Sequence, residues 1–149
     1  MRVSVIGGSA VDAATTATAR AVGRELGERG HDVVCGGLGG VMANVCRGVQ
    51  DADGHAIGIL PGDDPAAANE YVDTPIATGM GNARNVLVVL NGRATIAIDG
   101  ATGTLSEVGH ALDFGRPVAG LDTHDVPGVE AVATPEEAVA YVESAVAGQ

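Results

Sequence analysis

The chain has 149 residues, the size of a single domain with its own core, and carries a formal net charge of −11. It contains no lysine, and aromatic residues make up only 2% of it. This composition argues against a nucleic-acid partner, because nucleic-acid binding needs basic grooves and stacking rings. The acidic, lysine-free surface resembles that of proteins from salt-loving organisms, although a soluble acidic protein from a GC-rich genome would look the same.

Apolar runs alternate with helical patterns along the chain. In chain order we expect a strand at 2–6, a helix at 11–29, a strand at 32–35, a helix at 40–52, a strand at 55–60, a helix at 80–90, a strand at 94–98, a helix at 103–113, a strand at 117–120 and a helix at 135–146. Residues 61–78 have no helical period and predict a loop or a short edge strand.

This alternation predicts the fold class. We expect one α/β domain over 1–149, a Rossmann-like three-layer sandwich with a mostly parallel sheet and helices on both faces. Hydrophobic residues make up 46% of the chain, so its core must consist of Val, Ala, Ile and Leu. Such a core suits a parallel sheet that is buried on both faces.

Glycine clusters follow two of the expected strands. Gly7, Gly8 and Ser9 end the first, and the run 36–40 ends the second and leads to Met42. One glycine-rich turn is a weak signal, but open α/β sheets bind ligands at the carboxyl ends of their strands. Several such turns at strand ends therefore predict a ligand site.

A third cluster, 98–107, joins a strand to a helix that carries Glu107. Gly100 and Gly103 permit tight backbone geometry, and Thr102 and Thr104 supply hydroxyls. A glycine turn at a helix N-terminus makes an anion site, because unpaired amides and the helix dipole favour negative charge. The alternative is a capping box between Thr104 and Glu107, which needs no ligand.

A further segment, 79–85, contains Met80 between two glycines. These glycines would let the backbone approach a ligand, and the planar fork of Arg84 suits phosphate or carboxylate. Alternatively, Arg84 pairs with a surface carboxylate.

Metal, redox and membrane roles are not expected. His31, His55, His110 and His124 lack a paired metal-ligand spacing, and Cys35 and Cys46 are interpreted as small buried hydrophobes. No apolar run is long enough to span a bilayer, and there is no secretory signal. We therefore expect a cytoplasmic protein without a membrane partner.

The motifs resemble those of the Lonely Guy family of nucleoside-monophosphate phosphoribohydrolases and the Rossmann-like superfamily around it. The family signature PGGxGTxxE aligns with 99–107, where Asp99 and Ala101 stand in place of its proline and second glycine. Arg84 matches the arginine of an upstream Met–Arg motif, and the run 36–42 resembles the segment GGxxGxM. The resemblance is closest to a short subgroup related to the algal molybdenum cofactor carrier.

The resemblance implies one of two functions and a homodimer or homotetramer. We favour a non-catalytic binder of a phosphorylated, nucleotide-like ligand, with no required cofactor and with the molybdenum cofactor or a nucleotide as bound ligand. The alternative is a phosphoribohydrolase that releases free base and ribose 5-phosphate, with Glu107 and Arg84 as catalytic residues. A carboxylate at Asp99 would weaken phosphate binding unless it points away or meets a cation. The expected ligand-binding residues are Gly7, Gly8, Ser9, Gly36, Gly37, Gly39, Gly40, Met42, Gly79, Met80, Arg84, Asn85, Gly100, Thr102, Gly103, Thr104 and Glu107.

Overall fold

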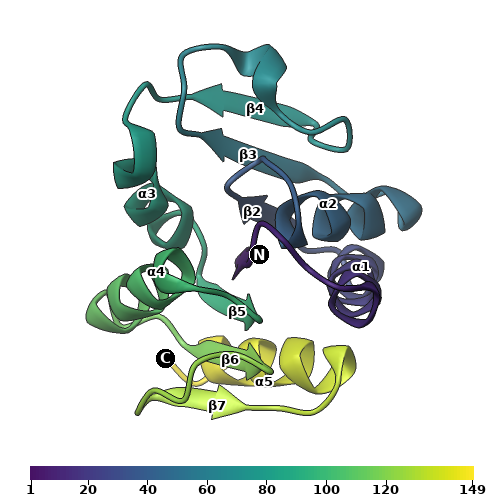
Figure 1. Cartoon of the computed structure of the whole chain (residues 1–149). Coiled ribbons are helices and arrows are strands. Elements are labelled where there is room, and N and C mark those ends of the chain that lie inside the picture. Colours follow the sequence, from purple (N-terminus) through teal and green to yellow (C-terminus); the bar gives the residue numbers. More distant parts are fainter.

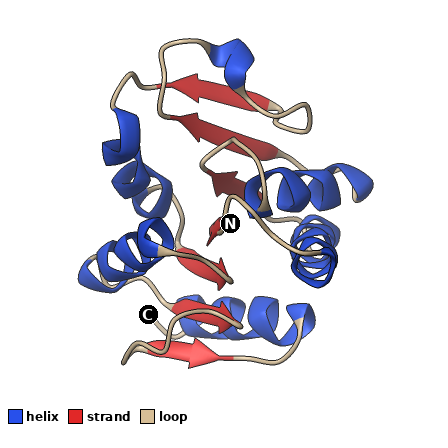
Figure 2. Ribbon diagram, in the orientation of Figure 1, coloured by secondary structure: helices blue, strands red, loops and turns tan.

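The computed structural model describes all residues 1–149 and shows seven strands in one parallel sheet (Figures 1 and 2). The strands are β1 (Arg2–Gly7), β2 (Asp32–Cys35), β3 (Ala56–Leu60), β4 (Thr74–Ala77), β5 (Ala94–Ile98), β6 (Val118–Leu121) and β7 (Val129–Ala131). The helices are α1 (Ala13–Glu28), α2 (Val41–Asp51), α3 (Asn85–Leu90), α4 (Thr102–Asp113) and α5 (Pro135–Ala147), with short 3₁₀ helices η1 (Pro65–Ala67) and η2 (Gly81–Arg84).

The helices form two layers around the sheet, which confirms the expected three-layer α/β fold. Helices α1, α2 and α5 pack on one face, and α3 and α4 pack on the other (Figure 1). The buried hydrophobic side chains are Val, Ala, Ile, Leu and Cys, without an aromatic residue among them. The aliphatic core expected from the composition is therefore confirmed.

The direction of the chain across the sheet reverses beside β1. The strand order is β4-β3-β2-β1-β5-β6-β7, so β1 pairs with β2 on one side and with β5 on the other. Open α/β sheets bind ligands at such a reversal, outside the carboxyl ends of the strands. At this point the chain is tightly packed: a Cβ on Gly7 would lie 2.3 Å from the Ile98 carbonyl oxygen.

Two local predictions needed correction, and one alternative is now resolved. Strand β7 was not expected, because its three residues are mostly exposed at the sheet edge and carry no clear apolar pattern. Residues 74–77 do form an edge strand, where Pro75 is tolerated. The helix expected at 80–90 is divided into η2 and α3, and Gly79 and Gly81 adopt left-handed φ values of 65° and 60° that a regular helix excludes. No helix is both long and apolar enough to cross a membrane.

Candidate functional site

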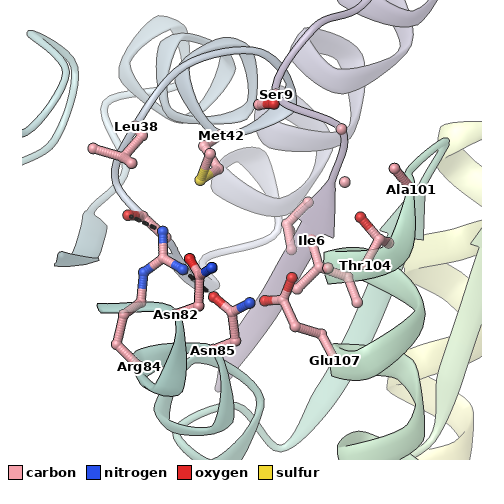
Figure 3. A pocket seen from close by; sticks show the side chains of 15 residues that line it. Ile6, Ser9, Leu38, Met42, Asn82, Arg84, Asn85, Ala101, Thr104 and Glu107 are labelled. Atoms are coloured by element: carbon pink, nitrogen blue, oxygen red, sulfur yellow. Dashed lines mark hydrogen bonds between the residues drawn. The ribbon is translucent and has the colours of Figure 1, made fainter. Parts of the chain in front are cut away.

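A cavity of about 260 Å³ opens at the point where the chain reverses, between the carboxyl ends of β1, β2 and β5 (Figure 3). Its walls come from the loops after these strands, from η2 and α3, and from the first turns of α2 and α4. The lining residues are Val5, Ile6, Gly7, Gly8, Ser9, Gly36, Leu38, Met42, Asn82, Arg84, Asn85, Ala101, Gly103, Thr104 and Glu107.

The structure brings together residues from all four segments that the sequence analysis singled out. Those that line the cavity are Gly7, Gly8, Ser9, Gly36, Met42, Arg84, Asn85, Gly103, Thr104 and Glu107. The other expected residues do not line it: Gly37, Gly39, Gly40, Gly79, Met80, Gly100 and Thr102. Several of these shape the backbone instead. Gly40, for example, has a φ of 66°, and a Cβ there would lie 2.3 Å from the Gly8 carbonyl oxygen.

The sequence analysis missed five lining residues: Val5, Ile6, Leu38, Asn82 and Ala101. Asn82 could have been found, because it is a polar residue in the segment 79–85, between Gly81 and Arg84. The apolar residues carried no such signal, since an aliphatic side chain at a strand end looks the same whether it faces a core or a ligand.

Two helices reach the cavity with uncapped N-termini. No side chain caps α2 or α4, and neither has an acidic residue in its first turn. By contrast, Asp12 caps α1 and Thr134 caps α5, both away from the cavity. The first amides of a helix have no partner within it. In α2 the Val41 amide donates to the Gly8 carbonyl oxygen at 3.0 Å, so the free donors are the next amides of α2 and the first amides of α4. The two helix starts also bring the positive ends of two helix dipoles.

The capping-box interpretation of Thr104 and Glu107 is wrong. Helix α4 begins at Thr102 with Ala101 as its N-cap, so Thr104 lies inside the first turn and Glu107 in the second. The Glu107 carboxyl group lines the cavity instead of folding back on the helix start (Figure 3). The side chain is therefore available to a ligand.

Arg84 is not a surface ion-pair partner either, because its side chain is only 7% exposed. Its Nε donates to the Ile59 carbonyl oxygen at 2.9 Å, and its Nη2 donates to the Gly36 carbonyl oxygen at 3.4 Å. These acceptors belong to β3 and to the loop after β2. The guanidinium group is thus held by the backbone of two neighbouring segments at the edge of the cavity.

Burial perturbs both charged side chains of the cavity. It raises the pKa of Glu107 to about 7, an effect that the positive charge of Arg84 partly offsets. Burial also lowers the pKa of Arg84, and the Glu107 carboxylate opposes that shift. Near neutral pH, Glu107 therefore exchanges between its acid and its carboxylate, while Arg84 keeps its charge because arginine does not deprotonate in proteins.

The backbone conformation at Asp99 excludes the proline that the family signature has at this position. Its φ is 53°, which proline cannot adopt because its ring holds φ near −65°. Asp99 lines a neighbouring cavity of about 310 Å³, together with Asp122, Thr15 and Thr18, and a Cβ placed on Gly8 would lie 3.2 Å from its Oδ2. It is absent from the lining of the cavity that Glu107 faces.

The cysteines lie in the core beneath the cavity. Cys35 and Cys46 are both fully buried as free thiols, with their Sγ atoms 3.5 Å apart. Elsewhere, no three His, Cys, Asp or Glu residues gather in a way that could hold a metal ion.

The apolar run at 86–90 lies largely inside the domain and offers little surface for an oligomer interface. Val88 and Val89 are buried inside the domain, and Leu90 is 44% exposed. A homodimer or homotetramer stays a prediction.

Comparison with known proteins identifies the family. A model of the SLOG cluster4 family matches residues 1–147. The chain belongs to the SLOG cluster4 family. An uncharacterized protein of Archaeoglobus fulgidus is 41% identical over 142 residues, which cover 95% of this chain and 93% of the relative.

Two solved structures that resemble this SLOG cluster4 protein bind the molybdenum cofactor. The molybdenum cofactor carrier protein of Chlamydomonas reinhardtii is 30% identical, with a TM-score of 0.89 over 98% of each chain. The molybdenum cofactor binding protein of Rippkaea orientalis is 32% identical, with a TM-score of 0.87 over 96% of this chain and 94% of that one. The expected relationship to the carrier-related subgroup is confirmed.

A more distant similarity shows only the fold. DNA processing protein A of Streptococcus pneumoniae is 16% identical, with a TM-score of 0.75 over 93% of this chain and 60% of that one.

Proposed function

We propose that this SLOG cluster4 protein is a carrier-like binding protein for a phosphorylated, nucleotide-like small molecule such as the molybdenum cofactor. The ligand would occupy the cavity between β1, β2 and β5, with its phosphate group at the start of α4. The 30–32% identity to molybdenum cofactor proteins over nearly the whole chain supports this class of ligand.

The observation that carries the proposal is the convergence of two uncapped helix N-termini on one cavity. In α2 and α4 no side chain supplies the cap that α1 and α5 have, although a cap typically stabilises a helix by ~1 kcal/mol. A ligand phosphate would satisfy the amides at these helix starts that have no partner and would complement both dipoles. The hydroxyls of Ser9 and Thr104 line the same cavity and could donate to further phosphate oxygens.

The size and lining of the cavity suit a phosphate with one adjoining ring. Its volume of about 260 Å³ lies below the ~300–1,000 Å³ of sites that enclose a drug-sized molecule. Leu38 and Met42 give one side of the cavity an apolar surface for a ring, opposite the polar side chains of Asn85 and Glu107 (Figure 3). The remainder of a larger ligand would extend beyond the cavity.

A thermal-shift screen tests the proposal. Nucleotides, phosphosugars and pterin phosphates are added at millimolar concentration, in low and in high salt. At least one phosphorylated compound should raise the melting temperature, because a ligand that binds only the native state stabilises it. If none of them does so in either salt, the proposal fails.

Glycosidic hydrolysis is a second candidate, and one observation favours it. A carboxyl group with a pKa of about 7 suits general acid–base catalysis at neutral pH, and Glu107 faces the cavity. A carrier should release no free base from adenosine 5′-monophosphate during prolonged incubation, as measured by chromatography. Release that is abolished in Glu107→Gln would instead support the hydrolase, with Glu107 as the catalytic residue.

A further inference from the structure

Asn85, the first residue of α3, lies between Arg84 and Glu107 in the cavity (Figure 3). Nη1 of Arg84 donates a hydrogen bond to Oδ1 of Asn85. Other nitrogens of the same guanidinium donate to the carbonyl oxygens of Ile59 and Gly36, as described above. The position of the group that faces Asn85 is therefore set by the backbone of β3 and of the loop after β2.

This hydrogen bond fixes which way the Asn85 amide points. A guanidinium group can only donate, so the amide oxygen of Asn85 must face Arg84 and the amide NH₂ must face the opposite way. Asparagine ends are often ambiguous in orientation, but the donor-only chemistry of Arg84 removes the ambiguity here. Asn85 consequently presents two N–H donors to whatever lies on its other side.

The other side of Asn85 is the start of α4. A Cβ placed on Gly103 would lie 3.9 Å from Nδ2 of Asn85 and would meet no other atom within 4 Å. Gly103 lies in the first turn of α4, where no side chain caps the helix. The amide donors of Asn85 and the free backbone amides of α4 thus face the same small volume, and a single acceptor group could bind both.

We infer that Asn85 is a specificity-determining residue that selects a tetrahedral oxyanion at this point of the cavity, and that Arg84 is the positioning residue that orients it. The inference rests on the proposed function, because it assigns the donor that recognises the anionic part of the ligand. The oxyanion could be a phosphate group or a molybdate group, since both present negatively charged oxygens in the same tetrahedral arrangement.

Substitution Asn85→Asp separates this role from a structural one. The new side chain still accepts from Arg84, now as an ion pair, so the fold should remain and the melting temperature should not fall. The atom that faces α4, however, changes from a donor to an anionic oxygen. Hydrogen bonds to charged groups contribute ~1.5–3 kcal/mol, and the variant adds repulsion to that loss, so oxyanion binding should weaken by about 100-fold or more.

Isothermal titration calorimetry of the full chain measures this effect with three probes: inorganic phosphate, sodium molybdate and adenosine 5′-monophosphate. If phosphate and the nucleotide bind but molybdate does not, the position between Asn85 and α4 holds a phosphate group. If only molybdate binds, that position holds the metal oxyanion. If the wild type binds none of the three probes, this inference is overturned, while the proposed function is decided separately by the thermal-shift screen, which includes phosphosugars and pterin phosphates.

Asn82→Asp is the matched control, because Asn82 lines the same cavity but accepts no hydrogen bond from Arg84. It adds the same charge without reversing an oriented donor, so it should weaken binding by less than about tenfold. Equal losses in the two variants, or wild-type affinity in Asn85→Asp, would overturn the role of Asn85 and leave the proposed function standing.

A double-mutant cycle tests whether Arg84 acts through Asn85. Arg84→Lys keeps the positive charge but loses the planar fork, so it should weaken oxyanion binding in the wild-type background. The same change should cost much less in an Asn85→Ala background, where no amide remains to be oriented. Equal costs in both backgrounds would show that Arg84 does not act through Asn85.

Discussion

Arg84 and Glu107 are electrostatically coupled in one cavity, although one lies at the end of η2 and the other in the second turn of α4. Burial disfavours the charged form of each side chain, and the opposite charge of the other partly restores it. The cavity therefore holds one permanent positive charge and one carboxyl group that titrates near neutral pH. Under the proposed function, protonation of Glu107 would let the site accept an anionic ligand without a second basic residue.

The raised pKa of Glu107 predicts a pH-dependent stability. Folding raises this pKa from 4.5 to about 7, so between these values the native state binds more protons than the unfolded state. The free energy of unfolding contributed by Glu107 therefore falls as pH rises through this window and stays low above it. Glu107→Gln, which mimics the protonated form, should gain stability relative to the wild type from pH 4.5 to 7. Urea unfolding at several pH values measures the difference.

Glu136→Gln provides the control for losing one carboxylate, because Glu136 is exposed in the first turn of α5. Its stability difference from the wild type should not show the same rise across this window. A Glu107→Gln difference that is constant from pH 4.5 to 8 would contradict the burial of this carboxyl group.

Gly103→Val should weaken ligand binding and retain the fold. The position is exposed, and an added Cβ would meet only Nδ2 of Asn85, at 3.9 Å, so the valine would fill the space in front of α4. Binding of adenosine 5′-monophosphate or of another compound found in the thermal-shift screen should weaken by more than about tenfold. Calorimetry measures the affinity, and circular dichroism verifies the fold.

The matched variant is Gly109→Val, on the same helix at an exposed position with open space around it and outside the cavity. It should bind like the wild type. Equal binding by Gly103→Val and Gly109→Val would place the ligand somewhere other than the start of α4.

Substitution by alanine should destabilise the protein at Gly40 but have little effect at the neighbouring Gly39. Gly40 has a φ of 66°, and its Cβ would lie 2.3 Å from the Gly8 carbonyl oxygen, so Gly40→Ala should cost about 2 kcal/mol or more of unfolding free energy. Gly39 has open space around it, so Gly39→Ala should change stability by less than ~0.5 kcal/mol. Urea denaturation compares them, and similar losses would contradict the close approach at Gly40.

Restoring the signature's proline at Asp99 should destabilise this chain. Proline cannot adopt the φ of 53° found there, and it would also remove the hydrogen bond that the Asp99 amide donates to the Leu121 carbonyl oxygen at 3.1 Å. Asp99→Pro should therefore cost ~3 kcal/mol. Asp99→Asn should be nearly neutral, because asparagine tolerates a left-handed backbone. A stable Asp99→Pro protein in thermal unfolding would show that this turn can rearrange.

The local patterns of the sequence determined the fold class and the approximate position of the site. Alternating apolar runs and helical patterns predict a parallel sheet, and Gly7, Gly36 and Gly103 mark the strand and helix ends that surround the cavity. These features can be predicted because hydrophobic periodicity and glycine turns depend on residues close together in the chain.

Only the tertiary structure decided the chemistry of the site. Arg84 donates to the carbonyl oxygens of Ile59 and Gly36, which lie 25 and 48 residues away in the chain. No local pattern could therefore distinguish a buried, oriented arginine from a surface ion pair. The raised pKa of Glu107 likewise depends on burial by distant segments, and the uncapped start of α4 overturned a plausible capping box. Desolvation and hydrogen-bond geometry arise from packing between elements, which the order of residues along one element does not specify.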